Sequence, residues 1–498
     1  MTKPGSLRLA AVDLGAESGR VLVGTFDGGR LAIEDVHRFP NVPVNVGGTL
    51  HWDALRLWGD ISTGLRKAGA AGDLASVAVD TWGVDFALLD ERGRLVGNPV
   101  HYRDARTDGM VEKAFSIVPK GEIYATTGIQ FMGINTVYQL LSLAVADDPQ
   151  LRHADRLLMM ADLFAHFLSG ASVSEYTLAS TSQALDARAR DWARPMLERL
   201  GIPTRLLPEI VAPGTDVGGL VGDLAGAPGL ARTRVILPGS HDTASAVVGT
   251  PIASPSTAYL SSGTWSLIGL EVPEPVISDV TLEANLTNEG GVDGTIRLLR
   301  NVVGLWLVQE SRRALWPDRE PPTYEKIAGL AETAPAFTAF IDPDDERFLR
   351  PGDLPARVRE FCAETGQPVP ADTATLIRVL LESLALRYAA ALDQLSAASG
   401  HRVDGLHIVG GGSNHRLLCR LTAGATGLRV RAGPIEATAI GNLAVQAIAA
   451  GELASIADAR ELAARSYPIT TYEPSGDWAE ARARFAALTA RRTAASEP

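Results

Sequence analysis

The chain has 498 residues, of which 46% are hydrophobic and 21% are charged, so it is long enough for two or more folded domains and shows no sign of disorder. Its formal net charge of −12 argues against nucleic acid or an anionic membrane surface as the main partner. Its two cysteines, Cys362 and Cys419, are too few for a disulfide scaffold or a thiolate zinc site. No apolar run is long enough for a signal peptide or a membrane span. We therefore expect a cytoplasmic protein.

The first 39 residues predict three strands joined by tight turns. The strands are the apolar runs LRLAAVDL, RVLVGTFD and LAIEDVHRF, and the connections are GAESG and GGR. Glycine allows the positive φ angles that such hairpins need. Apolar residues at helical spacing then predict a helix over residues 53–68.

The middle of the first half predicts alternating strands and helices. The stretch SVAVDTWGVDFALLD indicates a strand, a turn at Gly83 and a second strand. Helices are expected to dominate from there to about residue 200, including INTVYQLLSLAVA and ADLFAHFLSG. The stretch TRVILPGSHDTASAVVGT indicates a strand, a Gly-Ser break and a helix that begins near Asp242.

A domain boundary is predicted near residues 250–256, where two prolines occur among small residues. The following stretch, STAYLSSGTWSLIGLEV, repeats the strand–turn–strand pattern of the N-terminus. A long helix over 372–398, the strand LHIVGGGSN and another helix come after it. We therefore expect an α/β protein that uses a mixed sheet twice, with domains at 1–250 and 256–450 and a helical C-terminal tail at 451–498.

The first turn, between Asp13 and Arg20, could bind phosphate. Backbone N–H groups in a glycine-rich turn can converge on phosphate oxygens, whatever the net charge of the protein. A carboxylate at the end of a strand can hold Mg²⁺, usually through water, and the arginine would add a positive charge. The alternative is an ordinary surface hairpin in which these residues only form the turn.

Two later turns have similar chemistry. The stretch SSGTWS, residues 261–266, offers hydroxyl and amide donors, and the three glycines of HIVGGGSN allow the backbone to approach a ligand closely. Each could equally be an ordinary turn. These turns are not a P-loop, because the chain has no Gly-Lys-Ser/Thr. The dinucleotide fingerprint Gly-x-Gly-x-x-Gly is also absent.

Asp242, in the stretch GSHDTAS, is the candidate catalytic residue. A carboxylate at a strand-to-helix break could accept the proton of a substrate hydroxyl that attacks phosphorus. Its alternative role is the cap of the helix that follows. A zinc site at His241 is not supported, because no ligand partners occur at suitable spacing. The Trp-Gly turn in DTWGVDF could stack on a sugar or simply bury a core tryptophan.

Several motifs together resemble the FGGY carbohydrate kinase family over residues 7–450, and the L-rhamnulose branch of that family most of all. They are AVDLGAESGR, DTWGVDF, YRDART, SHDTASAV, YLSSGTWSL, NLTNEGG, RNVVGLWLVQE and HIVGGGSN. The resemblance implies an actin-like ATPase fold of two RNase H-like domains around an interdomain cleft. It also implies transfer of the ATP γ-phosphoryl group to the 1-hydroxyl of L-rhamnulose in L-rhamnose catabolism, with Mg²⁺ required, by a monomer or homodimer.

The resemblance also implies roles for individual residues. Asp242 matches the catalytic base, and Asp13 would face the metal. The sugar-binding positions match Gly83, His241, Asp242, Thr243 and Asn301. The nucleotide-binding positions match Ala16, Glu17, Ser18, Gly19, Arg20, Thr264, Gln309 and Gly411.

The chain departs from the family at two points, and other functions stay open. It lacks the Phe-Gly-Gly-Tyr string that names the family, and Glu17 stands where a serine is more usual. We expect the Glu17 carboxylate to point away from bound phosphate. Alternative functions are phosphorylation of L-fuculose, D-ribulose, D-xylulose or a polyol, an actin-like nucleotide-binding protein without sugar transfer, and a catalytically silent sugar sensor.

Overall fold

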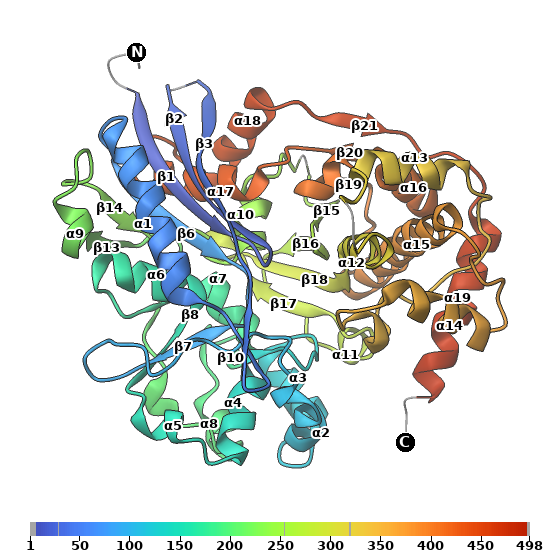
Figure 1. Ribbon diagram of the computed structural model, residues 1–498, viewed down its shortest axis with the longest axis horizontal. Helices are drawn as coiled ribbons and strands as arrows, with labels where there is room; N and C mark the ends of the chain where they lie inside the picture. Colours follow the sequence, from blue (N-terminus) through green and yellow to red (C-terminus); the bar gives the residue numbers. More distant parts are fainter. Residues whose placement is uncertain (1–5, 28, 253, 318–319, 496–498) are drawn as a thin grey trace. The chain divides into compact units, whose positions relative to one another are not determined.

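A computed structural model describes residues 6–27, 29–252, 254–317 and 320–495 (Figure 1). Gly28, in the second predicted turn, and Ala253, at the predicted domain boundary, lie outside the described residues. The chain divides into two compact units. The first contains Met1–Pro251, Glu271–Leu298 and Glu436–Tyr467, and the second contains Ile252–Leu270, Leu299–Ile435 and Pro468–Pro498.

A six-stranded mixed sheet forms the centre of the first unit. Its order is β13-β14-β6-β1-β2-β3. The first three strands along the chain pair antiparallel, β1 also pairs in parallel with β6, and β6 pairs in parallel with β14. The strand bounds are β1 Leu7–Leu14, β2 Ser18–Phe26, β3 Leu31–Pro40, β6 Ser76–Thr81, β13 Asp216–Gly219 and β14 Arg234–Ile236.

Helices cover both faces of this sheet. Helix α1 (Ala54–Ala70) begins at the N-cap Asp53 and packs Gly64 against Val21 of β2. Helix α17 (Ala437–Ala449) packs Leu443 against Gly24 of the same strand. Because residues 21 and 24 of a strand face opposite sides, the two helices lie on opposite faces.

The other elements of the first unit are short helices and two-stranded ribbons. The helices are α2 Met110–Phe115, α3 Lys120–Thr127, α4 Thr136–Val145, α5 Pro149–His153, α6 Met160–Ser169, α7 Tyr176–Ala179, α8 Arg194–Arg199, α9 Gly222–Ala225, α10 Asp242–Val248, α11 Asp279–Glu283 and α18 Ile456–Ser466. The ribbons pair β4 (Val44–Val46) with β5 (Thr49–His51), β7 (Phe86–Leu89) with β8 (Arg156–Met159), β9 (Ser174–Glu175) with β12 (Ile210–Val211), and β10 (Leu185–Asp186) with β11 (Asp191–Trp192).

A seven-stranded sheet has the order β17-β18-β16-β15-β19-β20-β21 and repeats the pairings of the first sheet. An antiparallel hairpin, β15–β16, pairs in parallel with β19, which pairs in parallel with β20, and β21 closes the edge antiparallel. The bounds are β15 Thr257–Ser262, β16 Trp265–Val272, β17 Thr287–Gly290, β18 Ile296–Val303, β19 Gly405–Val409, β20 Val430–Ala432 and β21 Thr470–Tyr472. The prediction of a mixed sheet used twice is therefore confirmed.

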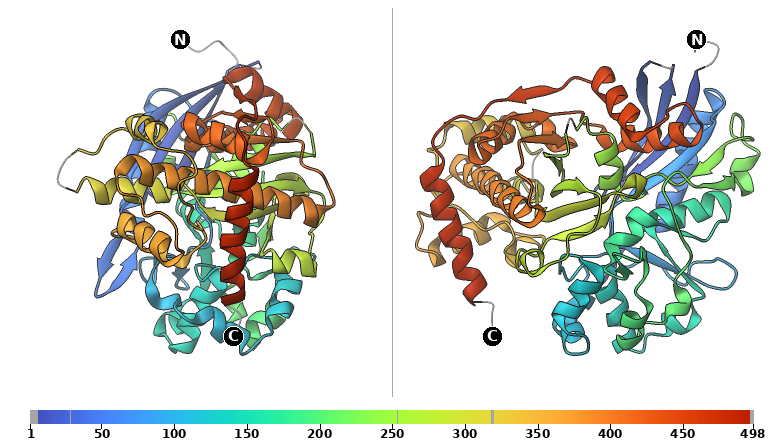
Figure 2. Two further views of the ribbon diagram at one scale, coloured as in Figure 1. Left: turned by 90° about the vertical axis from the view of Figure 1, so that its right-hand side faces the viewer. Right: turned by 180° about the vertical axis from the view of Figure 1, so that it is seen from behind.

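The long helix of the second unit is α15 (Thr373–Ser399), close to its predicted bounds. Asp372 caps its N-terminus by accepting from the N–H of Thr375, and Gly400 ends it in the left-handed region. It packs against α13 (Tyr324–Thr333), α16 (Arg416–Thr426) and α19 (Ala479–Ala495), the last drawn in dark red in Figure 2. The remaining helices are α12 Trp306–Leu315 and α14 Leu354–Glu364.

No helix in the described part of the chain has the length and apolar composition of a membrane span. The domain bounds and the interdomain cleft implied by the family resemblance stay predictions.

Candidate active site

Two carboxylates lie at neighbouring strand ends in the first unit. Asp13 of β1 is in register with Asp80 of β6 in the parallel pair, and it faces Arg20 across the antiparallel pair. Arg20 forms ion pairs with Asp13 and with Glu436, the latter at 2.5 Å between Nη1 and Oε2. The charge of Asp13 is therefore offset by an arginine from the same turn.

Asp80 is a completely buried carboxyl that the sequence analysis did not single out. Its Oδ2 accepts from the amide of Asn442 on α17 at 2.6 Å, and no hydrogen-bond partner for its Oδ1 exists among the described residues. Burial, together with the charges of Asp13 and Asp242, raises the pKa of Asp80 well above its ordinary value. The negative charges of neighbouring carboxylates therefore oppose ionisation of Asp80.

The first predicted nucleotide loop forms a closed turn between β1 and β2. The N–H of Gly15 donates to the carbonyl of Ser18 at 2.9 Å, and a Cβ on Gly19 would lie 2.3 Å from the ring of Phe39. Ala16 and Ser18 are half-buried, and Glu17 is exposed. The direction of the Glu17 carboxylate relative to bound phosphate stays a prediction.

Asp242 is the first residue of α10, as predicted. The N-cap position is occupied by His241, without a side-chain cap bond, so Asp242 does not have the capping role considered as its alternative. Oδ1 of Asp242 accepts from the hydroxyl of Thr243 at 3.1 Å and lies 3.4 Å from Nε2 of His241. The side chain is 33% exposed, so its carboxylate is accessible to a ligand.

The surroundings of Asp242 raise its pKa above the ordinary value. Burial is the largest cause and the charge of Asp13 adds to it, whereas His241 and Thr243 act in the opposite direction. A carboxylate with a raised pKa is a stronger base.

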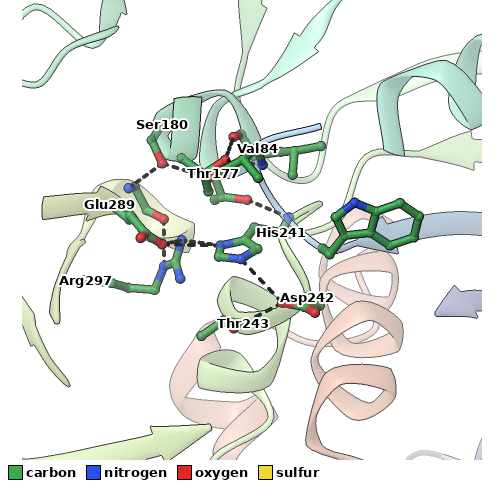
Figure 3. Close-up of polar contacts among 12 residues, drawn as sticks. Val84, Thr177, Ser180, His241, Asp242, Thr243, Glu289 and Arg297 are labelled. Atoms are coloured by element: carbon green, nitrogen blue, oxygen red, sulfur yellow. Dashed lines mark hydrogen bonds and ion pairs between the residues drawn. The ribbon is translucent and has the colours of Figure 1, made fainter. Parts of the chain in front are cut away.

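His241 lies between Asp242 and an ion pair from the β17–β18 hairpin (Figure 3). Its Nδ1 is 3.1 Å from Nη2 of Arg297 and 3.4 Å from Oε2 of Glu289. Nη2 of Arg297 and Oε2 of Glu289 are 3.2 Å apart and form an ion pair. All three side chains are buried, Arg297 completely.

The turn at Gly83 packs against residues 176–182. A Cβ on Gly83 would lie 2.9 Å from Oγ1 of Thr181, which also accepts from the N–H of Val84 at 3.1 Å. Val84 has a φ of 67°, which a β-branched residue rarely adopts, so tertiary contacts hold this turn in shape. Trp82 of this turn is 6% exposed and donates to Asp85, an arrangement in which the indole is mainly a core side chain.

Two more predicted nucleotide turns meet in the second unit. A Cβ on Gly412 would lie 2.0 Å from Oγ of Ser262, and one on Gly410, whose φ is 78°, would lie 2.9 Å from the carbonyl of Ser262. Gly411, the predicted nucleotide contact between them, is exposed, with open space where a Cβ would lie. The glycines are therefore required for close packing, and the exposed backbone between them can contact a ligand.

Thr264, Gln309 and Asn301 also belong to the second unit. The carbonyl of Thr264 accepts from the N–H of Trp306, at the start of α12, and Gln309 is on the first turn of that helix. Oε1 of Gln309 is buried and has no partner among the described residues, which suits a residue that binds a ligand. Asn301 is half-buried on β18.

The described residues contain no cluster of three or more His, Cys, Asp or Glu side chains arranged to hold a metal ion. The predicted contact of Asp13 with Mg²⁺ stays a prediction.

Sequence reasoning missed Asp80, Glu175, Glu289, Arg297 and Asn442. Asp80 could have been found, because it follows an apolar run and precedes a glycine turn, as Asp13 does. The other four act through contacts between segments distant in the chain, for which the sequence gives no local signal.

Comparisons with known proteins identify the family of this chain. Sequence models of the FGGY family of carbohydrate kinases match residues 9–249 (N-terminal domain) and 258–450 (C-terminal domain). A rhamnulokinase of Bacteroides thetaiotaomicron is 43% identical over 465 residues, 93% of this chain and 95% of that protein. A rhamnulokinase of Pectobacterium carotovorum is 41% identical over 491 residues, 98% of this chain and 97% of that protein.

Solved structures show the same fold at lower identity. A gluconate kinase from Lactobacillus acidophilus superposes with a TM-score of 0.81 at 17% identity and covers 98% of both chains. The glycerol kinase of Plasmodium falciparum, solved with ADP, has a TM-score of 0.77 at 14% identity and covers 99% of both chains. With its two domains matched in order and nearly its full length covered by relatives, this chain belongs to the FGGY family of carbohydrate kinases.

Proposed function

We propose that this protein transfers the γ-phosphoryl group of ATP to the 1-hydroxyl of L-rhamnulose and releases L-rhamnulose 1-phosphate and ADP. The identity of 41–43% to rhamnulokinases over nearly the whole chain supports the choice of sugar. The position of Asp242 carries the mechanism, because this partly exposed carboxylate at the start of α10 has a raised pKa and is held by its neighbours.

Asp242 acts as the general base in this proposal. Thr243 and His241 both contact Oδ1, so Oδ2 is left to accept the proton of the attacking hydroxyl. The hydroxyl oxygen forms a bond to phosphorus as the bond from phosphorus to the β,γ-bridging oxygen of ATP breaks. The charge of the carboxylate is neutralised in the same step.

The sugar and the nucleotide are assigned to separate sets of residues. Gly83, His241, Thr243 and Asn301 are the proposed sugar contacts, and the close approach of Gly83 to Thr181 fixes the path of its turn. The proposed nucleotide contacts are Ala16, Glu17, Ser18, Gly19, Arg20, Thr264, Gln309 and Gly411.

Asp13 is the proposed metal contact, through water. Mg²⁺ bound with ATP would offset the charge of the phosphates. Arg20, whose guanidinium already contacts Asp13 and Glu436, keeps that carboxylate oriented.

We place the reaction in the cytoplasm, where ATP is available and cysteines stay reduced; both cysteines are free and buried. Whether the enzyme is a monomer or a homodimer would be measured by sedimentation.

The test is a sugar panel with ATP and Mg²⁺. Purified protein is assayed with L-rhamnulose, L-fuculose, D-ribulose, D-xylulose and glycerol, and kcat/KM is compared. We expect the highest value for L-rhamnulose, with phosphate on the 1-hydroxyl by NMR. A higher value for another sugar would replace the substrate but keep the mechanism. ATP turnover that is independent of every sugar and accompanied by assembly would favour a filament-type ATPase instead.

A further inference from the structure

A chain of buried side chains leads away from the proposed base. Asp242 contacts His241 through Nε2, and His241 contacts the Arg297–Glu289 ion pair through Nδ1 (Figure 3). The family resemblance assigns His241 to the sugar and gives no role to Arg297 or Glu289. The contacts of Nδ1 determine which ring nitrogen carries the proton.

Arg297 disfavours a proton on Nδ1 of His241. A guanidinium has only N–H donors and no acceptor, and its Nη2 lies 3.1 Å from Nδ1. A hydrogen on Nδ1 would meet a hydrogen of Arg297, and the nearby acceptor, Oε2 of Glu289, is farther away at 3.4 Å. An unprotonated Nδ1 accepts from Arg297 without conflict, which leaves the ring proton on Nε2, facing Asp242.

Glu289 balances the charge of Arg297 in this buried place. Its Oε2 is 3.2 Å from Nη2, and the two side chains are 4% and 0% exposed. A buried arginine without a carboxylate would be costly, and a second positive charge on His241 would add to that cost. The paired carboxylate therefore lets Arg297 stay charged beside a neutral imidazole.

The backbone holds both partners in position. Nε of Arg297 donates to the carbonyl of Gly290 at 2.9 Å, and the N–H of Gly290 donates to the hydroxyl of Ser180 at 2.8 Å. The N–H of His241 donates to Oγ1 of Thr177 at 3.3 Å. Arg297 and His241 are thus fixed independently of each other, so their contact does not depend on a ligand.

We propose that Arg297, balanced by Glu289, holds His241 as the neutral imidazole with its proton on Nε2, the ring nitrogen that lies 3.4 Å from Oδ1 of Asp242. Arg297 is then a positioning residue that acts through His241, the proposed sugar contact, whose Nε2 faces Oδ1 and leaves Oδ2 of Asp242 for the sugar hydroxyl. The inference rests on the proposed function only where it refers to Asp242 as the base.

The first test measures the tautomer in the unsubstituted protein and uses a variant only for assignment. Protein labelled with ¹⁵N in its histidines is studied by long-range ¹H–¹⁵N NMR at the pH of the activity assay. The His241 resonances are assigned by their loss in His241→Gln. We expect the pattern of a neutral ring protonated on Nε2, and a ring protonated on Nδ1, or on both nitrogens, would overturn the proposal.

The second test removes the guanidinium. In Arg297→Met, Glu289 is the remaining partner of Nδ1, so we expect the ring proton to move to Nδ1. We also expect kcat to fall about 10-fold or more, with a smaller change in the KM for sugar. Arg297→Lys keeps a cationic donor and should retain part of the rate. Arg190→Met is the matched control, because Arg190 donates to Gly294 in the same hairpin, and it should leave the tautomer and kcat unchanged.

The two proposals fail in different ways. Full kcat and an unmoved proton in folded Arg297→Met would overturn the role of Arg297, whatever the substrate. Full turnover in Asp242→Asn would remove the base of the proposed function but would leave the NMR result for His241 intact. If Arg297→Met does not fold, the measurement on the unsubstituted protein still decides the tautomer.

Discussion

Glu175 is joined to Ser240 by a hydrogen bond of 3.1 Å from the backbone N–H of Ser240 to Oε2 of Glu175, two residues before the proposed base. The same carboxylate accepts from the N–H groups of Thr177 and Leu178 and from the hydroxyl of Thr177. It is completely buried. One side chain therefore caps α7 and holds the segment that leads into α10.

Glu175→Gln should therefore weaken both stability and activity. The amide retains the shape but replaces one acceptor oxygen with a donor facing other donors, which we expect to cost about 2 kcal/mol in the free energy of unfolding. Chemical denaturation and kcat would be measured together. Glu198→Gln, at an exposed position of α8, is the control and should change neither. A Glu175→Gln protein as stable and active as the unsubstituted one would contradict this role.

Asp242→Asn should abolish most turnover while substrates still bind. Loss of a general base lowers kcat by about 100-fold or more. Calorimetry would measure the binding of sugar and ATP, and steady-state assays would measure kcat. The control is Asp223→Asn on an exposed turn of α9, which should have normal kinetics. Near-normal turnover in the Asp242 variant would remove this residue from its role.

The pH dependence of kcat/KM for the sugar should report the raised pKa of Asp242. Only the ionised carboxylate can accept the hydroxyl proton, so the rate falls as the pH decreases through that pKa. Because burial and the charge of Asp13 raise it, the acid limb should lie above the ordinary aspartate value of about 3.9. The profile would be measured at saturating Mg-ATP. A rate that stays constant as the pH falls to this ordinary value would contradict the assignment.

Asp13→Ala should impair the use of Mg-ATP more than the binding of sugar. The substitution removes the proposed water-mediated metal contact, and Arg20 retains Glu436 as a partner. We expect a higher KM for Mg-ATP and a steeper dependence on free Mg²⁺, with little change in the KM for sugar. Asp35→Ala on β3, where the side chain is exposed, is the control. An unchanged magnesium dependence would argue against Asp13 as a metal contact.

Gly441→Ala should disturb the helix that carries Asp242. A Cβ on Gly441 would lie 1.8 Å from the carbonyl oxygen of Ser245, so α10 and α17 would have to separate. We expect a loss of about 2 kcal/mol in the free energy of unfolding, together with a lower kcat. Gly59→Ala in α1, where a Cβ meets nothing within 4 Å, should be neutral or stabilising. Equal stability of the two variants would show that the close contact is unimportant.

The sequence predicted the elements well where the signal was local. Alternating apolar residues and glycine turns identified β1 to β3, and the Gly-Ser break placed the start of α10 at Asp242. The choice between a helix cap and a free carboxylate could not be made from the sequence, because it depends on His241 occupying the N-cap position. Nor could the sequence separate a sugar-stacking Trp82 from a core one, because Asp85 and Trp52 decide its burial.

The partners of the site were beyond local patterns. Arg297 reaches His241 over 56 residues of chain, and Asn442 reaches Asp80 over 362. Such pairs depend on the sheet order and on which helix covers which face. The pairing of strands in the first sheet brings Asp13 and Asp80 together, and α17 then supplies the amide.

The contact between α10 and α17 also has a consequence for the order in which the protein is made. A ribosome releases Asp242 long before Gly441, and residues 299–435 of the second unit emerge between them. The N-terminal segment can therefore begin to fold early, but helix α10 gains its packing partner only after residues 437–449 have been made. A nascent chain that stalls before residue 436 would carry every proposed sugar contact and still lack the helix that packs against α10, which carries the proposed base.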